Sequence, residues 1–304
     1  MKQLSLWFAL VSCTVLVSLI SESCKKELAP GSPDISKSSS AVAKNQPPPP
    51  PSANPAIAYR YRSDLKVMNA DGSNQTTIVS GGGPGVWSPD GKSLLFQHPG
   101  GLSLVDVSVV NGKPIGSNVR QIPINFPSSP NGQRWSPRGD SIVFVTIEDN
   151  NVYTVSSAGG TPRLVYSAAI GFETFDPDWS PDGTRIVFDE WNDAWTQSSL
   201  KVLTLATGNI TTVVPPSAPL IYYPTWSHHG DRIVYEAGAI YTVTPIANAL
   251  PVKVTSGDYP TWSPDDSKLA LVAGKQSGIF TYTFSGGTTQ TLSGTGDFLD
   301  WKRY

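Results

Sequence analysis

Aromatic and acidic residues stand at fixed distances before several tryptophans of this 304-residue chain, and their types suit binding chemistry. The pairs three and four positions before a tryptophan are Phe175 with Asp176, Tyr222 with Tyr223, Asp258 with Tyr259, and Asp297 with Phe298. Aromatic faces attract cations and stack on flat groups, and carboxylates pair with cations or accept hydrogen bonds from hydroxyls. If folding gathers these pairs, they predict a site for a cationic or hydroxyl-rich ligand, such as a peptide or a glycan.

Motifs that would carry catalysis are absent from the sequence. There is no Gly-x-Ser-x-Gly nucleophile turn and no phosphate-binding loop. The three histidines are His98, His228 and His229, and the last two lie in a turn that we expect at the opposite rim from His98. They are therefore predicted to be solvated turn residues, and neither a zinc site nor any other cofactor is expected.

The acidic residues leave an enzymatic alternative open. An enzyme would need a general base and a charge stabiliser, and the candidate acids are Asp176, Asp258 and Asp297. No histidine or cluster of basic residues accompanies them in the sequence. A calcium site shared by Asp176 and Asp182 is not expected, because a strand of about 3.3 Å per residue separates the two carboxylates.

A repeated phrase shows which elements must position these residues. "WSPDG" at Trp87 recurs as "WSPRG", "WSPDG", "WSHHG", "WSPDD" and finally "WKRY", at Trp135, Trp179, Trp226, Trp262 and Trp301. Successive tryptophans are 48, 44, 47, 36 and 39 residues apart. Such a period, with several short strands in each unit, is typical of propeller blades. The sequence therefore predicts an all-β, six-bladed propeller.

The chemistry of one unit explains its phrase. Trp179 ends a strand and offers a large apolar surface for burial between neighbouring blades. Pro181, Asp182 and Gly183 favour a tight turn, after which "TRIVF" returns as a buried strand. Strands expected in "AIAYRYR", "DLKVMNADGSNQ" and "TTIV", at 56–62, 64–75 and 76–79, precede Trp87 without a tryptophan strand of their own, and "DFLDW" at 297–301 supplies it. The N- and C-terminal strands are thus predicted to share the closing blade.

These units resemble the WD40-like repeats of the TolB β-propeller family, most closely in "VMNADGSNQTTI" and "WSPDGKSLLF". The resemblance covers residues 56–304 and implies a propeller. The complete ring, the missing catalytic motifs and the aromatic mouth favour a non-enzymatic propeller that binds proteins. TolB proteins carry an α/β domain before the propeller, whereas this sequence has a Ser/Pro-rich stretch there. Some polysaccharide lyases use related propellers, so glycan binding or polysaccharide degradation is the alternative function.

A propeller would place the strand entrances around one mouth of its central channel. The pairs named above would then form a crescent, joined by Trp191 and Trp195 from the loop "DEWNDAWT". The alternative interpretation is structural: the aromatic rings plug the channel, the two tryptophans cover a blade edge, and the domain serves as a spacer.

The N-terminus has the pattern of an export signal. Lys2 precedes a nearly continuous apolar run from Leu4 to Ile20, which ends at "SESC". Its resemblance to bacterial lipoprotein signals implies a signal peptide at 1–23 and lipid attachment at Cys24. Cleavage before Cys13, an uncleaved anchor and an ordinary secretory signal are the alternatives. Residues 24–55 are predicted to be a disordered tether, stiffened at the five prolines 47–51.

Charge and cysteine content complete the prediction. With 22 basic and 24 acidic residues the chain has no excess of positive charge, which argues against a nucleic-acid partner. Both cysteines precede the repeats, so no disulfide is expected in the folded body. The predicted protein is a non-enzymatic lipoprotein, anchored to the outer membrane and facing the periplasm or the cell surface. Its expected partner is an envelope protein or peptide.

Overall fold

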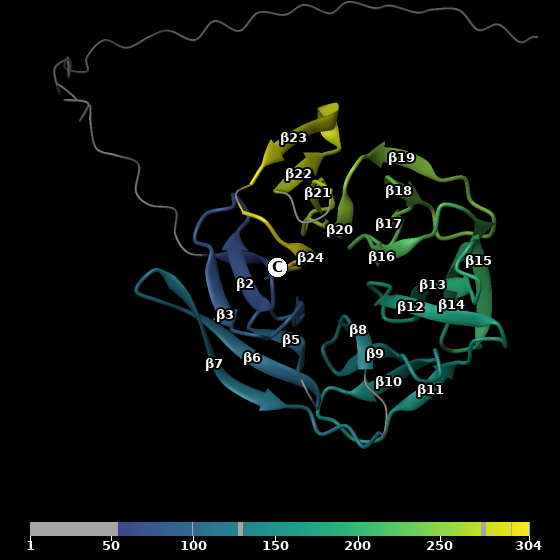
Figure 1. Cartoon of the computed structure of the whole chain (residues 1–304), viewed down its shortest axis with the longest axis horizontal. Helices are drawn as coiled ribbons and strands as arrows, with labels where there is room; N and C mark the ends of the chain where they lie inside the picture. Colours follow the sequence, from purple (N-terminus) through teal and green to yellow (C-terminus); the bar gives the residue numbers. More distant parts are fainter. Residues whose placement is uncertain (1–53, 99, 127–129, 275–277, 293, 304) are drawn as a thin grey trace, which may run out of the picture. The chain divides into compact units, whose positions relative to one another are not determined.

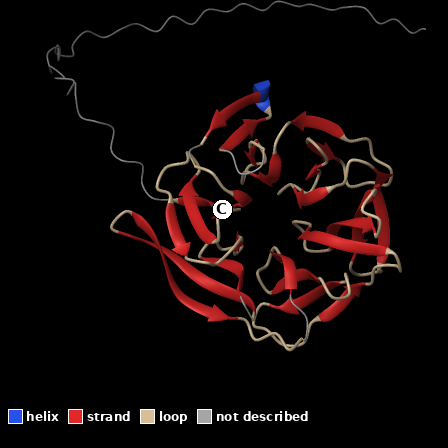
Figure 2. Cartoon of the chain, in the orientation of Figure 1, coloured by secondary structure: helices blue, strands red, loops and turns tan. Residues whose placement is uncertain are grey.

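The computed structural model describes residues 54–303, except 99, 127–129, 275–277 and 293. It consists of six four-stranded antiparallel sheets arranged around a centre (Figure 1). A short 3-10 helix, η1 (Ser285–Gly287), is the one helix in this part of the chain (Figure 2). None of the described segments forms a helix long and apolar enough to cross a membrane. The predicted signal peptide, Cys24 and the tether up to residue 53 lie outside the described residues.

The first three blades follow one another along the chain. The first blade comprises β4 (Gly85–Trp87), β5 (Ser93–His98), β6 (Gly101–Val110) and β7 (Lys113–Gln121). The second comprises β8 (Pro130–Trp135), β9 (Ser141–Thr146), β10 (Val152–Ser156) and β11 (Arg163–Tyr166). The third comprises β12 (Phe172–Trp179), β13 (Arg185–Asn192), β14 (Ser198–Thr204) and β15 (Asn209–Ser217). The first-numbered strand of each blade is innermost (Figure 1).

The last three blades include the one that closes the ring. The fourth blade comprises β16 (Tyr222–Trp226), β17 (Ile233–Glu236), β18 (Ile240–Val243) and β19 (Val252–Thr255). The fifth comprises β20 (Asp258–Trp262), β21 (Lys268–Val272), β22 (Ile279–Thr283) and β23 (Thr288–Thr291). The closing blade has the order β24–β1–β2–β3, from β24 (Asp297–Trp301), β1 (Pro55–Tyr61), β2 (Asp64–Asn69) and β3 (Thr76–Val79). The predicted six blades and the shared closing blade are confirmed.

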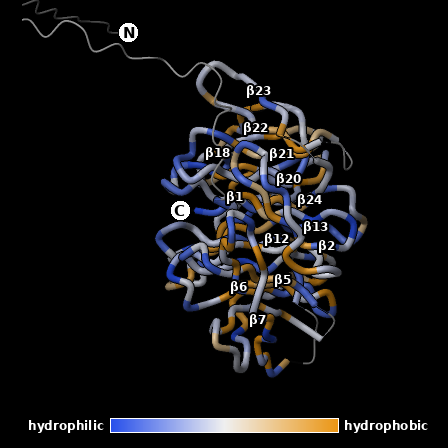
Figure 3. The backbone as a smooth tube through the Cα atoms, turned by 90° about the vertical axis from the view of Figure 1, so that its left-hand side faces the viewer, coloured by the Kyte–Doolittle hydropathy of each residue, from blue (hydrophilic) through white to orange (hydrophobic). Residues whose placement is uncertain are grey.

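The core lies between neighbouring blades. The six repeat tryptophans are at most 9 % exposed. Trp179, for example, packs against Val143 and Val145 of the second blade and against Ile186 and Phe188 of its own. Most hydrophobic residues follow the strands, and most hydrophilic residues lie in the connecting loops (Figure 3). Burial of apolar surface between blades is therefore what holds the ring together.

Candidate functional site

Each innermost strand bends just inside one end of the ring, which we call the mouth. The residues with positive φ at this bend are Gly83 (64°), Gly132 (61°), Asp176 (44°), Tyr223 (50°), Tyr259 (53°) and Phe298 (49°). The pairing register slips beside the last five, as in a β-bulge. A positive φ is unfavourable for residues other than glycine, above all for bulky ones. Four blades therefore hold strained residues at the mouth, and the bulge sets the direction of their side chains.

The bulged aromatic residues are in mutual contact. The Tyr223 and Tyr259 ring centres are 4.5 Å apart, Tyr259 and Phe298 4.7 Å, and Tyr223 and Phe298 5.6 Å. Tyr222 continues the series at 5.9 Å from Tyr223. Trp191 adds a ring 4.7 Å from Tyr222. Folding thus brings these predicted residues together into one aromatic crescent.

The third blade forms the end of the crescent, and its two tryptophans differ. Trp191 belongs to β13 and not to the predicted loop; it is 6 % exposed and lies 4.9 Å from Phe175. Its Nε1 donates to Asp189 Oδ2 at 2.6 Å and to the Ile221 carbonyl at 3.0 Å. Trp195 lies in the β13–β14 loop with its side chain 57 % exposed. Trp191 is therefore a packing residue, whereas Trp195 offers its ring to solvent.

Arg60 neutralises the acid of the closing blade. Its Nε and Nη2 donate to the two carboxylate oxygens of Asp297 at 2.8 and 2.7 Å. The guanidinium also lies 4.3 Å from the centre of the Phe298 ring. Asp297 therefore forms an ion pair within the protein, whereas the sequence had predicted it as a residue that binds a ligand.

A pocket of about 520 Å³ opens beside this ion pair. Its lining residues are Arg60, Tyr222, Tyr223, Glu236, Asp258, Tyr259 and Asp297. Burial, the charge of Asp258 and the hydrogen bond between the two side chains raise the pKa of Glu236 to about 7. Glu236 Oε2 also accepts the Tyr259 amide at 3.3 Å. Three carboxylates, three tyrosines and Arg60 thus share one space, which we call the tyrosine–acid pocket.

Two more acids lie under the third blade's part of the crescent. Burial and the nearby Asp176 raise the pKa of Asp189 well above its usual range. Burial also raises the pKa of Asp176, whose Oδ2 accepts the Tyr223 amide at 3.2 Å. Acids that resist ionisation are poor ligands for a cation. Asp176 therefore serves chiefly to hold the bulge of the fourth blade.

Sequence reasoning missed Arg60, Asp189 and Glu236. Each lies on the second strand of its blade, directly opposite the residue four positions before the tryptophan, in the pairs Arg60 with Asp297, Asp189 with Phe175, and Glu236 with Tyr222. Counting across the hairpin from "AIAYR", "RIVFDE" and "RIVYE" would have placed them at the mouth.

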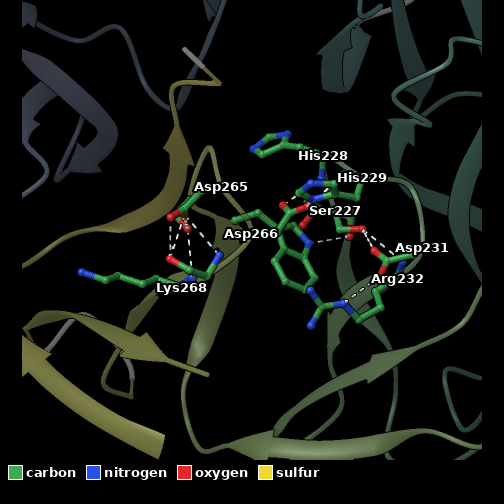
Figure 4. A network of polar contacts seen from close by, with 12 residues as sticks. Ser227, His228, His229, Asp231, Arg232, Asp265, Asp266 and Lys268 are labelled. Atoms are coloured by element: carbon green, nitrogen blue, oxygen red, sulfur yellow. Dashed lines mark hydrogen bonds and ion pairs between the residues drawn. The ribbon is translucent and has the colours of Figure 1, made fainter. Parts of the chain in front are cut away.

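The histidines lie at opposite ends of the ring, as predicted, but they are not simply solvated. His228 and His229 donate their backbone amides to the two carboxylate oxygens of Asp266, both at 2.9 Å. His229 Nδ1 lies 2.6 Å from Asp266 Oδ2 (Figure 4). Burial lowers the pKa of His228 to about 4. Within the described residues, no group of three His, Cys, Asp or Glu is placed to hold a metal ion.

Comparison with known proteins agrees with this architecture. No family model matches the chain. The protein named TolB homolog of Chlorobium luteolum is 30 % identical over 169 residues, which span 52 % of this chain and 37 % of that protein. This chain therefore matches little more than a third of that relative's length.

Solved structures give the same result. TolB from Acinetobacter baumannii aligns with a TM-score of 0.59 at 18 % identity, over 81 % of this chain and 66 % of that one. A protein described as putative TolB from Agrobacterium tumefaciens aligns with a TM-score of 0.58 at 20 % identity, over 81 % and 92 %. An oligogalacturonate lyase in complex with manganese aligns with a TM-score of 0.51 at 16 % identity, over 78 % and 73 %. The folded body of this chain is a TolB-like six-bladed β-propeller.

Proposed function

We propose that this chain is a non-enzymatic lipoprotein of the bacterial envelope whose propeller mouth binds a protein partner. The supporting observation is the combination of exposed apolar side chains and the tyrosine–acid pocket at one end of the ring. Ile170, Phe172 and Trp195 are 104 %, 40 % and 57 % exposed at the mouth end of the third blade. Exposed aromatic anchors beside a concave polar site are common in recognition surfaces.

The proposed envelope location is based on the N-terminal sequence and on the similarity to TolB proteins. The signal at 1–23, lipid attachment at Cys24 and the tether at 24–55 would anchor the propeller to the outer membrane, on its periplasmic or surface side. Labelling with a radioactive fatty acid tests the anchor: the full chain takes up label, and the Cys24→Ala variant does not. Label that persists in the variant contradicts lipidation at Cys24.

Partner capture tests the binding role. We expect the double variant Trp195→Ala/Tyr222→Ala to lose at least about tenfold in affinity for its envelope partner, since hot-spot aromatics each contribute about 2 kcal/mol or more. The control is Leu250→Ala, an 88 % exposed residue in the β18–β19 loop at the end opposite the mouth. Equal capture by the double variant and the control contradicts the proposal. Trp191 is left intact because it is buried.

The alternative is glycan binding or polysaccharide degradation. Glu236 favours it, because a carboxyl group whose pKa is about 7 suits a general base and Arg60 lies in the same pocket. Asp176, Asp258 and Asp297 are less suited, since the first accepts the Tyr223 amide, the second shares a hydrogen bond with Glu236 and the third pairs with Arg60. Incubation with acidic polysaccharides tests this alternative. Cleavage by the unsubstituted chain that is lost in Glu236→Gln would support this alternative. If the chain neither cleaves nor binds glycans, the alternative is ruled out.

A further inference from the structure

The closing blade contains an internal example of guanidinium recognition. Asp297 and Phe298, four and three positions before Trp301, hold Arg60 between them. The carboxylate receives two parallel N–H bonds, and the aromatic ring lies beneath the planar cation. This combination of bidentate ion pair and stacking is specific to arginine, because an ammonium group lacks both the planar face and the fork.

The fifth blade repeats the acid and the aromatic ring but not the arginine. Asp258 and Tyr259 stand four and three positions before Trp262. Tyr259 adopts the same positive φ as Phe298, 53° against 49°. Opposite Asp258 in the sheet is Val272, whereas Arg60 lies opposite Asp297. The chain therefore builds the same receptor and provides no cation on that strand to fill it.

The carboxylates of the tyrosine–acid pocket further distinguish the fifth blade from the closing blade, where Asp297 is paired with Arg60. No ion pair involving Asp258 or Glu236 is formed among the described residues. Glu236 from β17 adds a second carboxylate to the one supplied by β20. Tyr222 and Tyr223 complete the walls, so an entering cation would meet aromatic faces and carboxylate oxygens together.

We propose that the tyrosine–acid pocket binds the guanidinium of an arginine side chain carried by the partner, an inference that rests on the proposed function. The fork of the guanidinium pairs with the Asp258 and Glu236 carboxylates, and its plane lies against the tyrosine rings. Arg60 borders the same pocket but is held by Asp297, which leaves Asp258 and Glu236 for the incoming group.

Binding should be coupled to release of a proton. The groups around Glu236 are Asp258 from β20, Asp176 from β12, the hydroxyls of Tyr222, Tyr223 and Tyr259, and the Arg60–Asp297 ion pair; no histidine lines the pocket. Burial raises the pKa of all three tyrosines, so they stay neutral near pH 7. With a pKa of about 7, Glu236 carries a proton in part of the molecules at neutral pH. Arginine favours the ionised carboxylate, so binding should strengthen from pH 6 to pH 8.

Three capped tripeptides test the proposal, with arginine, citrulline or lysine between two glycines. Citrulline keeps the shape of arginine without its charge. Titration followed by protein NMR should show at least about tenfold tighter binding of the arginine peptide than of the citrulline peptide, with lysine between them. Equal binding of all three, or preference for lysine, overturns the inference.

Matched variants locate the site. Asp258→Asn should weaken the arginine peptide about tenfold, and Glu236→Gln should abolish the rise in affinity between pH 6 and pH 8. Asp193→Asn removes an exposed carboxylate of the β13–β14 loop, at the mouth but outside the pocket, and should change neither. If Asp193→Asn weakens binding as much as Asp258→Asn, general electrostatic attraction explains the result.

Failure here can be separated from failure of the proposed function. A partner that is captured in the usual amount by Asp258→Asn but not by Trp195→Ala/Tyr222→Ala would leave the recognition mouth standing and remove the arginine site. Capture of the partner in the usual amount by both variants would count against the recognition mouth itself.

Discussion

Single side chains show that the turns after the tryptophans are chemically equivalent despite their different sequences. In "WSPDG" the serine hydroxyl donates to the aspartate two positions later, as Ser180 does to Asp182 at 2.5 Å. In "WSPRGD" the aspartate comes two residues later still, and Ser136 donates to Asp140 at 2.8 Å. In "WSHHGD" Ser227 donates likewise to Asp231, at 2.9 Å. The carboxylate is thus retained where arginine or histidine replaces the usual aspartate.

This equivalence gives a prediction for the second blade. Asp140→Ala should destabilise the fold by about 1 kcal/mol, the usual net value of one hydrogen bond, because Ser136 loses its acceptor. Arg138→Ala, in the slot that other turns give to aspartate, should cost less than about 0.5 kcal/mol as an exposed substitution. Urea unfolding of both variants measures the two values. A larger loss for Arg138→Ala would show that the turn is held differently.

Glu236 should make stability depend on pH in a direction opposite to that of most carboxylates. Its folded pKa of about 7 exceeds the value of 4.5 usual for glutamate, so the folded state holds the proton more tightly. The resulting stabilisation is complete below pH 4.5 and is lost as the pH rises through 7. Glu236→Gln stays neutral, so relative to the unsubstituted chain it should gain on the order of 1 kcal/mol between pH 5 and pH 8, allowing for partial exposure. Urea unfolding of both proteins at pH 5 and pH 8 measures this. If the free energies of unfolding of Glu236→Gln and of the unsubstituted chain differ by the same amount at both pH values, the prediction is refuted.

At the scale of the strand, the sequence predicted which residues meet but not how. The period of the tryptophans was sufficient to place Tyr222, Tyr259 and Phe298 around one mouth. It gave no sign that five of the six innermost strands bulge there, because positive φ is normally announced by glycine or asparagine and in four of these strands it falls on tyrosine, phenylalanine or aspartate. Contacts with neighbouring blades impose that conformation, and such tertiary effects are invisible in local composition.

The packing between blades can be tested with two tryptophans of opposite exposure. Trp179→Ala should cost roughly 3–5 kcal/mol, because it removes a buried ring shared by the second and third blades. Trp195→Ala removes the same side chain from solvent-exposed surface and should cost less than about 1 kcal/mol. Chemical unfolding compares them directly. A small cost at Trp179 would mean that the blades do not depend on their tryptophans.

At the scale of the whole ring, a side chain links one blade to the next at three of the junctions. There the residue before a tryptophan accepts the amide of the following blade's tryptophan: Asp178 accepts Trp226 N at 2.9 Å, and Asp300 accepts Trp87 N at 2.7 Å. Thr261 Oγ1 accepts Trp301 N at 3.1 Å in the same way. Ring closure was predictable, since the leftover strands at both ends complete one blade. The links between blades were not predictable, because the position directly before the tryptophan is occupied by valine, arginine, aspartate or threonine in different blades.

The closing strand should therefore control the cooperativity of the entire propeller. A chain that ends at Gly296 lacks β24 and loses the pairing with β1, the buried Leu299 and Trp301, and the Asp300 link to the first blade. Two buried side chains alone contribute about 5–10 kcal/mol, which is comparable to the whole stability of a typical domain. We expect this chain to unfold well below the full chain's transition temperature, with fast hydrogen exchange in β1.

Two further measurements separate ring closure from simple truncation. A chain ending at Arg303 keeps all of β24 and the ion pair between Arg303 and Asp178, and it should unfold within a few degrees of the full chain. A synthetic peptide of residues 295–303, added to the chain that ends at Gly296, should restore protection of the β1 amides, because the peptide supplies the missing strand. If the shorter chain already unfolds in one sharp transition at the original temperature, the blades are stable without closure, and the ring does not act as one cooperative unit.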